Sequence, residues 1–490
     1  MSQLAQQFQS SLLFSFMDKY LGYILRFIST IIIARLLSPE EIGIFSVAFV
    51  IIGLGHVLRD FGVAQYLIQE KDLRDHKIKA AFATMFMIAW SMWFILYLGK
   101  DLLAAFYDEP RLTSALNILI IIFLLAPFGS IRIALMRRQM MFKTLAKINI
   151  FSYITLFIVT LVLCYFKFSF MALVWGQLAG VLATNLGCVL VCRKNYWYFP
   201  SLQGARAVIK FGFNITLANI IENLAEGAPD LFIGKFMNMQ AVGIYSRAQG
   251  CVGLFKIFVT ASVWPVILPY FSIKNRAGIQ LLPDYLTAIS IYTIFAWPFF
   301  IALMVLAEPI VLLLYGQQWH ASILLVQILC LSAIFEASFP FRAPLLVALG
   351  NTQLNLKLQF MTSGMKIMAI LIGSCYGLIY AALSLVLSEF IAQLYIFHGL
   401  KSVVKLNFMN WFEQVRLSLL VSILLGVVCF SLKLLSANYA ISHWQLIMSA
   451  IALCALLWLA VVLYFKHPLS QHLVQFYSRF KRRSLREETL

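Results

Sequence analysis

Motifs for covalent or nucleotide-driven chemistry are missing from this sequence of 490 residues. It contains no P-loop of the form GxxxxGK[ST], which nucleotide-driven transporters and kinases need to hold phosphates. Its eight cysteines form no CxxC pair and lie within or beside apolar segments, as small buried hydrophobic residues do. We therefore expect no enzyme active site, metal site, cofactor or disulfide.

Charged residues are scarce as well. Only 12% of the residues are Asp, Glu, Lys or Arg, whereas 62% are hydrophobic, and the mean hydropathy is +0.88. Length alone would suggest two or three soluble domains. Apolar runs separated by short polar breaks instead predict an all-α polytopic membrane protein. The polar N-terminus has no cleavable signal pattern, so we expect the first span to stay in the mature chain.

The apolar runs divide into fourteen predicted transmembrane helices. They cover residues 11–36, 42–68, 80–99, 113–136, 148–166, 170–191, 208–234, 240–270, 284–306, 320–348, 354–374, 378–397, 413–432 and 445–465.

The first hairpin of this series, Ser10 to Ile68, is repeated later in the chain. Its short polar turn leads into Gly43-Ile44-Phe45-Ser46, which corresponds to Gly243-Ile244-Tyr245-Ser246 at the start of another long apolar helix. Internal duplication is typical of transporters that bind substrate between two halves near the membrane midplane.

The duplication predicts a division into two pseudo-symmetric six-helix lobes with two appended helices. The predicted parts are an N-lobe at 1–192, a cytoplasmic linker at 193–207, a C-lobe at 208–400, appended spans 13 and 14 at 401–466, and a basic cytoplasmic tail at 467–490.

Acidic residues are half as frequent as basic ones, 20 against 38, which gives a net charge of +18. Most of the basic residues lie in the loops after even-numbered spans and in the C-terminal tail. This asymmetry follows the positive-inside rule, so it predicts cytoplasmic termini rather than binding to nucleic acid.

The few acids inside predicted spans concentrate in the seventh. Glu222, Glu226 and Asp230 follow one another at i, i+4 and i+8, so they share one helical face. Such a group suits coupling to H⁺ or Na⁺, since ionisable groups in a membrane mark ion pathways. Alternatively, these acids pair with basic residues of neighbouring helices and only hold their lobe together.

Four cations lie inside four different spans: Arg26, Arg59, Lys256 and Lys366. Unmatched cations are costly in lipid unless water or an anion meets them, so they predict a polar cavity that binds an anionic substrate. The alternative is internal pairing, of Arg59 with Asp60, or of Lys256 with Glu226 or Glu336.

Two segments of the sequence resemble a known family. The run from Ala34 to Phe45, with Leu58-Arg59-Asp60-Phe61-Gly62, is similar to the N-terminal signature of polysaccharide-transport (Wzx-type) flippases. The run from Asp230 to Phe236, followed by Val242-Gly243-Ile244-Tyr245, resembles the seventh and eighth spans of the same family. These flippases belong to the multidrug/oligosaccharidyl-lipid/polysaccharide exporter superfamily.

The resemblance implies a central cavity that alternates between leaflets of the bacterial cytoplasmic (inner) membrane. It implies as cargo an undecaprenyl-diphosphate-linked oligosaccharide, such as a capsule, exopolysaccharide or O-antigen unit of lipopolysaccharide. Expected partners are membrane lipids and the polysaccharide polymerase and export machinery.

Other functions stay open at this point. A peptidoglycan-precursor flippase or an ion-coupled drug exporter would have the same architecture, although the cations disfavour a cationic drug. A membrane glycosyltransferase, polymerase or ligase is disfavoured because the longest outward loop spans only about a dozen residues by span lengths.

The charge asymmetry predicts a topology that reporter fusions can test. Fusions after Gly204 and Leu490 should be active in the cytoplasm, and fusions after Asp108 and Ala437 should be active outside it. A C-terminal reporter active outside would mean that the number of spans is odd.

Overall fold

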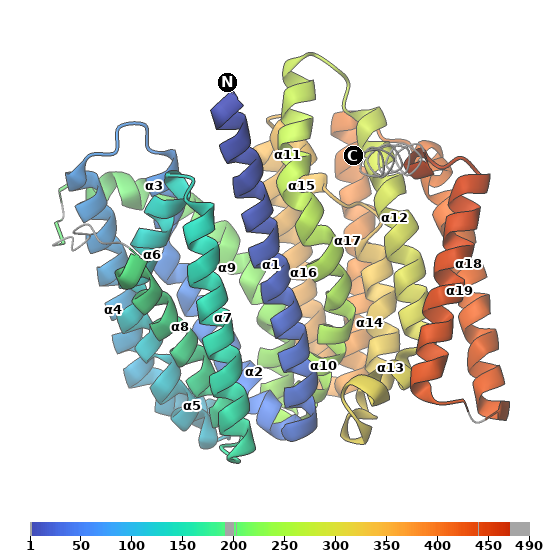
Figure 1. The fold of residues 1–490 in the computed structure, drawn as a ribbon, viewed down its shortest axis with the longest axis horizontal. Coiled ribbons are helices and arrows are strands. Elements are labelled where there is room, and N and C mark those ends of the chain that lie inside the picture. The colour runs from blue at the N-terminus through green and yellow to red at the C-terminus, as the bar shows by residue number, and fades with distance from the viewer. Residues whose placement is uncertain (1, 192–199, 202, 440, 471–490) are drawn as a thin grey trace, which may run out of the picture. The chain divides into compact units, whose positions relative to one another are not determined.

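The computed structural model describes residues 2–191, 200–201, 203–439 and 441–470, which form helices and no strand. The helices are α1 (Ser2–Leu36), α2 (Pro39–Asp60), α3 (Val63–Gln69), α4 (Asp75–Phe106), α5 (Arg111–Leu119), α6 (Ile121–Arg138), α7 (Phe142–Tyr165), α8 (Met171–Val191), α9 (Ala205–Phe236), α10 (Met239–Phe255), η1 (Lys256–Thr260), α11 (Ala261–Arg276), α12 (Leu282–Val305), α13 (Ala307–Leu314), η2 (Gln317–Trp319), α14 (Ser322–Glu336), α15 (Arg342–Ala348), α16 (Thr352–Tyr376), α17 (Leu378–Val404), α18 (Phe408–Tyr439) and α19 (His443–Tyr464) (Figure 1).

Ten helical segments of the described chain are long and apolar enough to cross a membrane, which confirms a multi-pass helical protein. The other four predicted spans correspond to α1, α9, α10 with α11, and α14 with α15. These are helical too, but they are rich in polar residues or interrupted. They therefore carry most of the ionisable groups that the sequence places in the membrane.

The chain forms two compact units, which divide inside α10. Unit 1 comprises residues 1–247 and 370–381, and unit 2 comprises residues 248–369 and 382–490. Of the predicted linker at 193–207, residues 193–199 and 202 lie outside the described part, and the predicted lobe boundaries stay a prediction. Helix α9 packs along α2 and belongs to unit 1. The tail beyond residue 470 also lies outside the described residues.

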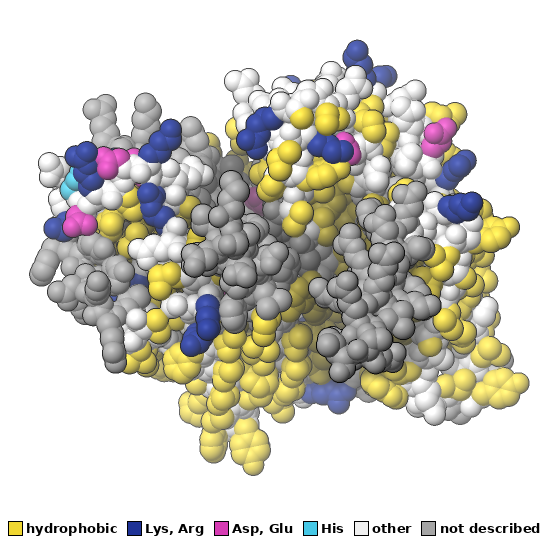
Figure 2. All heavy atoms as spheres, turned by 45° about the horizontal axis from the view of Figure 1, so that its top comes forward, with side chains coloured by type: hydrophobic (Ala, Val, Ile, Leu, Met, Phe, Trp, Pro, Cys, Tyr) yellow, Lys and Arg dark blue, Asp and Glu magenta, His cyan; other side chains and the backbone are white. Residues whose placement is uncertain are grey.

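Within each unit the surface separates charge from apolar groups. Figure 2 shows most of the charged side chains of this face in its upper part, and wide areas of hydrophobic side chains below them. Many of the exposed side chains are large and apolar, including Leu98, Leu102 and Tyr165 in unit 1. A surface of this kind suits a hydrocarbon surrounding rather than water.

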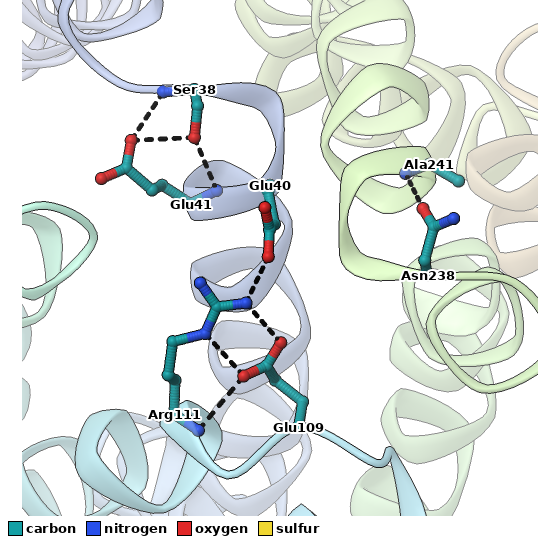
Figure 3. A network of polar contacts seen from close by, with 7 residues as sticks. All are labelled: Ser38, Glu40, Glu41, Glu109, Arg111, Asn238 and Ala241. Atoms are coloured by element: carbon teal, nitrogen blue, oxygen red, sulfur yellow. Dashed lines mark hydrogen bonds and ion pairs between the residues drawn. The ribbon is translucent and has the colours of Figure 1, made fainter.

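The repeat is visible in how α2 and α10 begin. Ser38 caps α2 by accepting a hydrogen bond from the Glu41 backbone N–H, and the Glu41 side chain reaches back to Ser38 (Figure 3). Two hundred residues later, Asn238 Oδ1 accepts from the Ala241 backbone N–H at 2.8 Å. The predicted spans leave residues 37–41 for the turn before α2. The turn is shorter in the structure, because Pro39 to Glu41 already belong to the helix.

The two repeat-related helices cross at equivalent residues inside unit 1. A Cβ on Gly43 would lie 1.7 Å from the Met239 carbonyl oxygen, and a Cβ on Gly243 would lie 1.8 Å from the Pro39 carbonyl oxygen. One turn further on, the hydroxyl of Ser46 donates to that of Ser246 at 3.2 Å. The crossing is thus self-complementary, and its backbones touch because both positions lack a side chain.

A polar network surrounds the start of α2. Arg111 binds both oxygens of Glu109 and also pairs with Glu40 (Figure 3). These bonds from the guanidinium hold the pKa of Glu109 below its usual value. Nearby, Lys235 pairs with Asp108 at 3.4 Å. The network ties α9, α5 and the loop after α4 to the start of α2.

The crossing predicts opposite effects for two glycines of α2. Gly43→Ala should lower stability by about 1–3 kcal/mol, because its methyl group has no space beside a backbone carbonyl. Gly53 has no atom within 4 Å of an added Cβ, so Gly53→Ala should be neutral or stabilising by about 0.5–1 kcal/mol. Thermal unfolding of the purified variants measures both. Equal midpoints would contradict the close approach.

Candidate functional site

The three acids of α9 occupy different surroundings. Glu222 and Glu226 are exposed on the helix surface, whereas Asp230 is largely enclosed. Asp230 Oδ1 is buried without a hydrogen-bond partner in the described part of the chain. Arg247 of α10 acts on it electrostatically, and Tyr107 and Tyr245 are also electrostatic neighbours. Of the three, Asp230 is the acid that the fold encloses.

The two cations predicted in the first spans differ in their pairing. Arg59 is 8% exposed and binds its neighbour Asp60 through Nη2 at 2.6 Å and through Nε at 3.0 Å. Arg26 is exposed on α1, and its backbone carbonyl accepts a bond from Thr30. Arg59 is thus already neutralised, whereas the guanidinium of Arg26 remains accessible.

Helix α1 presents Arg26 from a position fixed by packing on α7. Asp18 accepts a hydrogen bond from Asn149 Nδ2 at 2.7 Å, and Gly22 leaves room for the ring of Tyr153. Asp18 is buried, so this bond is a polar anchor between two membrane helices. The neighbouring turn of α1 then carries Arg26.

In unit 2, Lys366 is held by an ion pair. Its Nζ lies 2.8 Å from Glu389 Oε2, and Gln393 donates from Nε2 to Glu389 Oε1 at 2.8 Å. Both oxygens of this carboxylate are therefore bound, and Glu389 is only 3% exposed. Sequence reasoning did not assign Glu389 or Gln393 to the site. Their i, i+4 spacing in an otherwise apolar span was the available signal.

Lys256 begins the π-helical turn η1 that joins α10 to α11. Such turns contain an extra residue and often occur at functional sites. The lysine is exposed, and Thr260 at the end of the turn contacts the hydroxyl of Tyr292 at 2.8 Å. The electrostatic surroundings of Lys256 include Glu336, the last residue of α14. Lys256 and Glu336, one of the two pairings considered from the sequence, are thus electrostatic neighbours.

Unit 2 also contains an apolar cavity of about 880 Å³. It lies among α12, α14, α17 and α18, with Trp297, Phe390, Trp411 and Phe430 among its walls, and Gln393 is one of its few polar lining groups. Gln393 Oε1 is buried without a hydrogen-bond partner in the described chain. A cavity of this size and polarity suits a long hydrocarbon chain rather than a sugar.

The described residues contain no group of His, Cys, Asp and Glu arranged to hold a metal ion. Seven cysteines are free thiols, including Cys429 and Cys454, whose sulfur atoms lie 3.5 Å apart. Cys192 lies outside the described residues.

Comparison with known proteins identifies a family match over residues 32–324, to the model described as polysaccharide biosynthesis protein. The chain is 22% identical over 414 residues to the teichuronic acid biosynthesis protein TuaB of Bacillus subtilis, which covers 82% of this chain and 84% of that protein. It is 24% identical over 345 residues to the lipopolysaccharide biosynthesis protein WzxC of Escherichia coli, covering 70% of each.

Solved structures share the fold. The lipid II flippase MurJ in an inward closed conformation matches with a TM-score of 0.73 at 15% identity, over 94% of this chain and 99% of that one. An inward-facing multidrug transporter of the MATE family matches with a TM-score of 0.60 at 13% identity, over 78% and 94% of the two chains.

The buried ion pair of unit 2 predicts a stability effect. Glu389→Gln should cost about 3–5 kcal/mol, because it removes the buried carboxylate that neutralises the half-buried Lys366. The double variant Lys366→Met with Glu389→Gln should recover most of that loss. As a matched control, Glu308→Gln breaks the more exposed pair with Lys433 and should cost less than about 1 kcal/mol. Thermal unfolding in detergent gives the ranking, and equal losses would contradict it.

Proposed function

Because this chain belongs to the polysaccharide biosynthesis protein family, we propose that it is a flippase for a polyprenyl-diphosphate-linked oligosaccharide. The family match over more than half of the chain is the observation that carries this function. TuaB and WzxC are named for the biosynthesis of two different cell-surface polymers, and their matches cover most of the chain. The protein is a membrane transporter rather than an enzyme, so its work is to move a polar head across the bilayer.

The charged helices supply what an anionic head group requires. A diphosphate enters the membrane at a large cost unless cations replace its water. Arg26 and Lys256 are both exposed, and neither lies in one of the ten apolar spans. We assign them the main contacts with the diphosphate. Arg59 and Lys366 already contact acidic partners. In this proposal they attract the diphosphate only through their longer-range electrostatic potential.

The apolar cavity of unit 2 suits the lipid part of the same substrate. Its aromatic and aliphatic walls include Phe408, Trp411, Ile423 and Phe430 of α18, one of the two appended helices. A polyprenyl chain lying there would remain in an apolar surrounding while the head group moves. This gives the appended helices a role in holding substrate.

The proposed arrangement in the membrane has fourteen spans in two six-helix lobes with two appended helices. In this proposal the protein lies in the bacterial cytoplasmic membrane with both termini inside, and access to the substrate alternates between the two leaflets. The product is a head group delivered to the outer leaflet, where a polysaccharide polymerase and its export machinery would take it up.

Coupling to an H⁺ or Na⁺ gradient is proposed for the acids of α9. Asp230 is the best candidate among Glu222, Glu226 and Asp230, because an enclosed carboxylate with an unbonded oxygen can bind a proton or a small cation. Opening the α2–α10 crossing beside it would expose this carboxylate to water. Ion binding and movement of the helices would then be linked.

The head-group assignment is tested by charge removal. Arg26→Ala and Lys256→Ala should each reduce complementation of a flippase-deficient strain, with lipid-linked oligosaccharide accumulating on the cytoplasmic face. Losing a charge-assisted contact costs about 1.5–3 kcal/mol, or roughly ten- to a hundredfold in affinity. Arg26→Lys should restore export only in part, since lysine lacks the planar fork that binds phosphate.

Lys71→Ala, in an exposed loop, is the matched control and should export normally. Abundance of each variant in the membrane must be measured alongside. Normal export by both alanine variants at normal abundance would show that these cations do not bind the substrate. If cells that carry a variant fail to export peptidoglycan precursors instead, the protein transports a different lipid-linked substrate.

A further inference from the structure

Two thiols of unit 2 lie in direct contact. Cys429 belongs to α18 and Cys454 to α19, and these two helices pack against each other. Their Sγ atoms lie 3.5 Å apart, and both thiols are free. A disulfide requires the two sulfur atoms at about 2.0 Å, so a small shift of the side chains brings them within bonding distance.

The two thiols differ in their access from outside. Cys429 is fully buried, in an apolar cluster with Leu306 and Leu446. Cys454 is half-buried, and Leu453 and Leu456 beside it on α19 are exposed apolar side chains. An uncharged oxidant dissolved in hydrocarbon therefore reaches Cys454 before Cys429. This is the arrangement of an attacked thiol with a resolving thiol behind it.

Cys429 lies on a helix that forms a wall of the apolar cavity. Val427 and Phe430, close to it on α18, line the cavity and are 59% and 55% exposed. On the opposite wall Leu394 of α17 is 56% exposed. The cavity is thus open at one side along α17 and α18, and a lipid chain that enters or leaves it passes α18.

Both helices that carry the thiols are joined to α12 by polar contacts. The hydroxyls of Ser418 on α18 and Thr293 on α12 lie 2.9 Å apart. Trp458 of α19 donates from Nε1 to the Ile294 carbonyl oxygen at 2.9 Å. A covalent bond between Cys429 and Cys454 would add a third connection, between α18 and α19. The three helices would then be linked in a ring, which restricts the movement of α18.

We propose that Cys429 and Cys454 form a reversible disulfide when a membrane-soluble hydroperoxide oxidises them, and that this bond stops the exchange of lipid in the cavity. Disulfides of this kind, formed transiently by thiols that are otherwise reduced, occur in redox-sensing proteins. Formation of the bond stands by itself, whereas its effect on export rests on the proposed function.

The oxidation takes two balanced steps. The hydroperoxide transfers its terminal oxygen to the Cys454 sulfur, the O–O bond breaks, and the thiol proton leaves with the other oxygen as an alcohol. Cys429 then attacks the sulfenic sulfur of Cys454. The S–S bond forms, the S–O bond breaks, and the Cys429 proton leaves with the hydroxyl group as water. The two thiols lose two electrons, which reduce the O–O bond.

The bond is tested on the purified full chain in lipid nanodiscs, with cumene hydroperoxide as the oxidant. Peptide mass spectrometry should find Cys429 linked to Cys454, and dithiothreitol should remove the link. Cys375→Ala is the matched control, because it removes an exposed thiol of α16, and it should form the same link. The linked chain should also unfold at a higher temperature, since the bond closes a loop in the unfolded state.

The effect on export is tested in a flippase-deficient strain that this chain complements. A pulse of cumene hydroperoxide should lower export by wild type and by Cys375→Ala in proportion to the linked fraction, and dithiothreitol should restore it. Cys429→Ala and Cys454→Ala should keep their export during the pulse. If Cys429→Ala fails to fold, Cys454→Ala, at the half-buried position, still gives the comparison.

Three results would overturn the inference and leave the proposed function standing. They are an oxidised wild type without the Cys429–Cys454 link, a linked wild type that exports at the untreated rate, and an equal loss of export in Cys454→Ala. Failure of the untreated wild type to complement the strain contradicts the proposed function instead. The peptide measurement then still decides whether the thiol pair forms its bond.

Discussion

The cost of placing charge in a membrane constrains this structure more than any other interaction. Each ionisable group inside a span must be paired, enclosed or directed to water. Arg59 lies beside Asp60, Lys366 is bound by Glu389, and Glu389 is bound again by Gln393. Arg26, Lys256 and Glu336 are the more exposed charged groups. The buried pairs stabilise helix packing, and exposure leaves the other side chains accessible.

The polar helices can exist only because apolar ones accompany them. The ten strongly apolar segments suit a hydrocarbon surrounding, and α1, α9, α10 with α11, and α14 with α15 carry most of the ionisable groups. Interruptions such as the π-turn at Lys256 and the break after Glu336 are tolerated at membrane depth where protein or water meets the freed backbone groups. Substrate chemistry and helix irregularity thus occur together.

Duplication explains the crossing of α2 and α10. A repeat related by a two-fold axis brings equivalent residues together at that axis, as Gly43 meets the start of α10 and Gly243 meets the start of α2. The caps follow the same rule, with Ser38 and Asn238 at equivalent positions. Small residues at the axis allow backbone contact, so the junction depends on shape more than on side-chain chemistry.

Much of this could be predicted from sequence, because membrane burial and duplication leave patterns in the chain itself. Apolar runs determined the helical class, and the offset of 200 residues determined the repeat. Tertiary structure alone decided which charges are paired, since Lys366 and Glu389 are distant in sequence and belong to different helices. It also decided that α9 joins unit 1 and that the three acids of α9 differ in burial. Such contacts depend on how helices pack, which periodicity within a single helix does not specify.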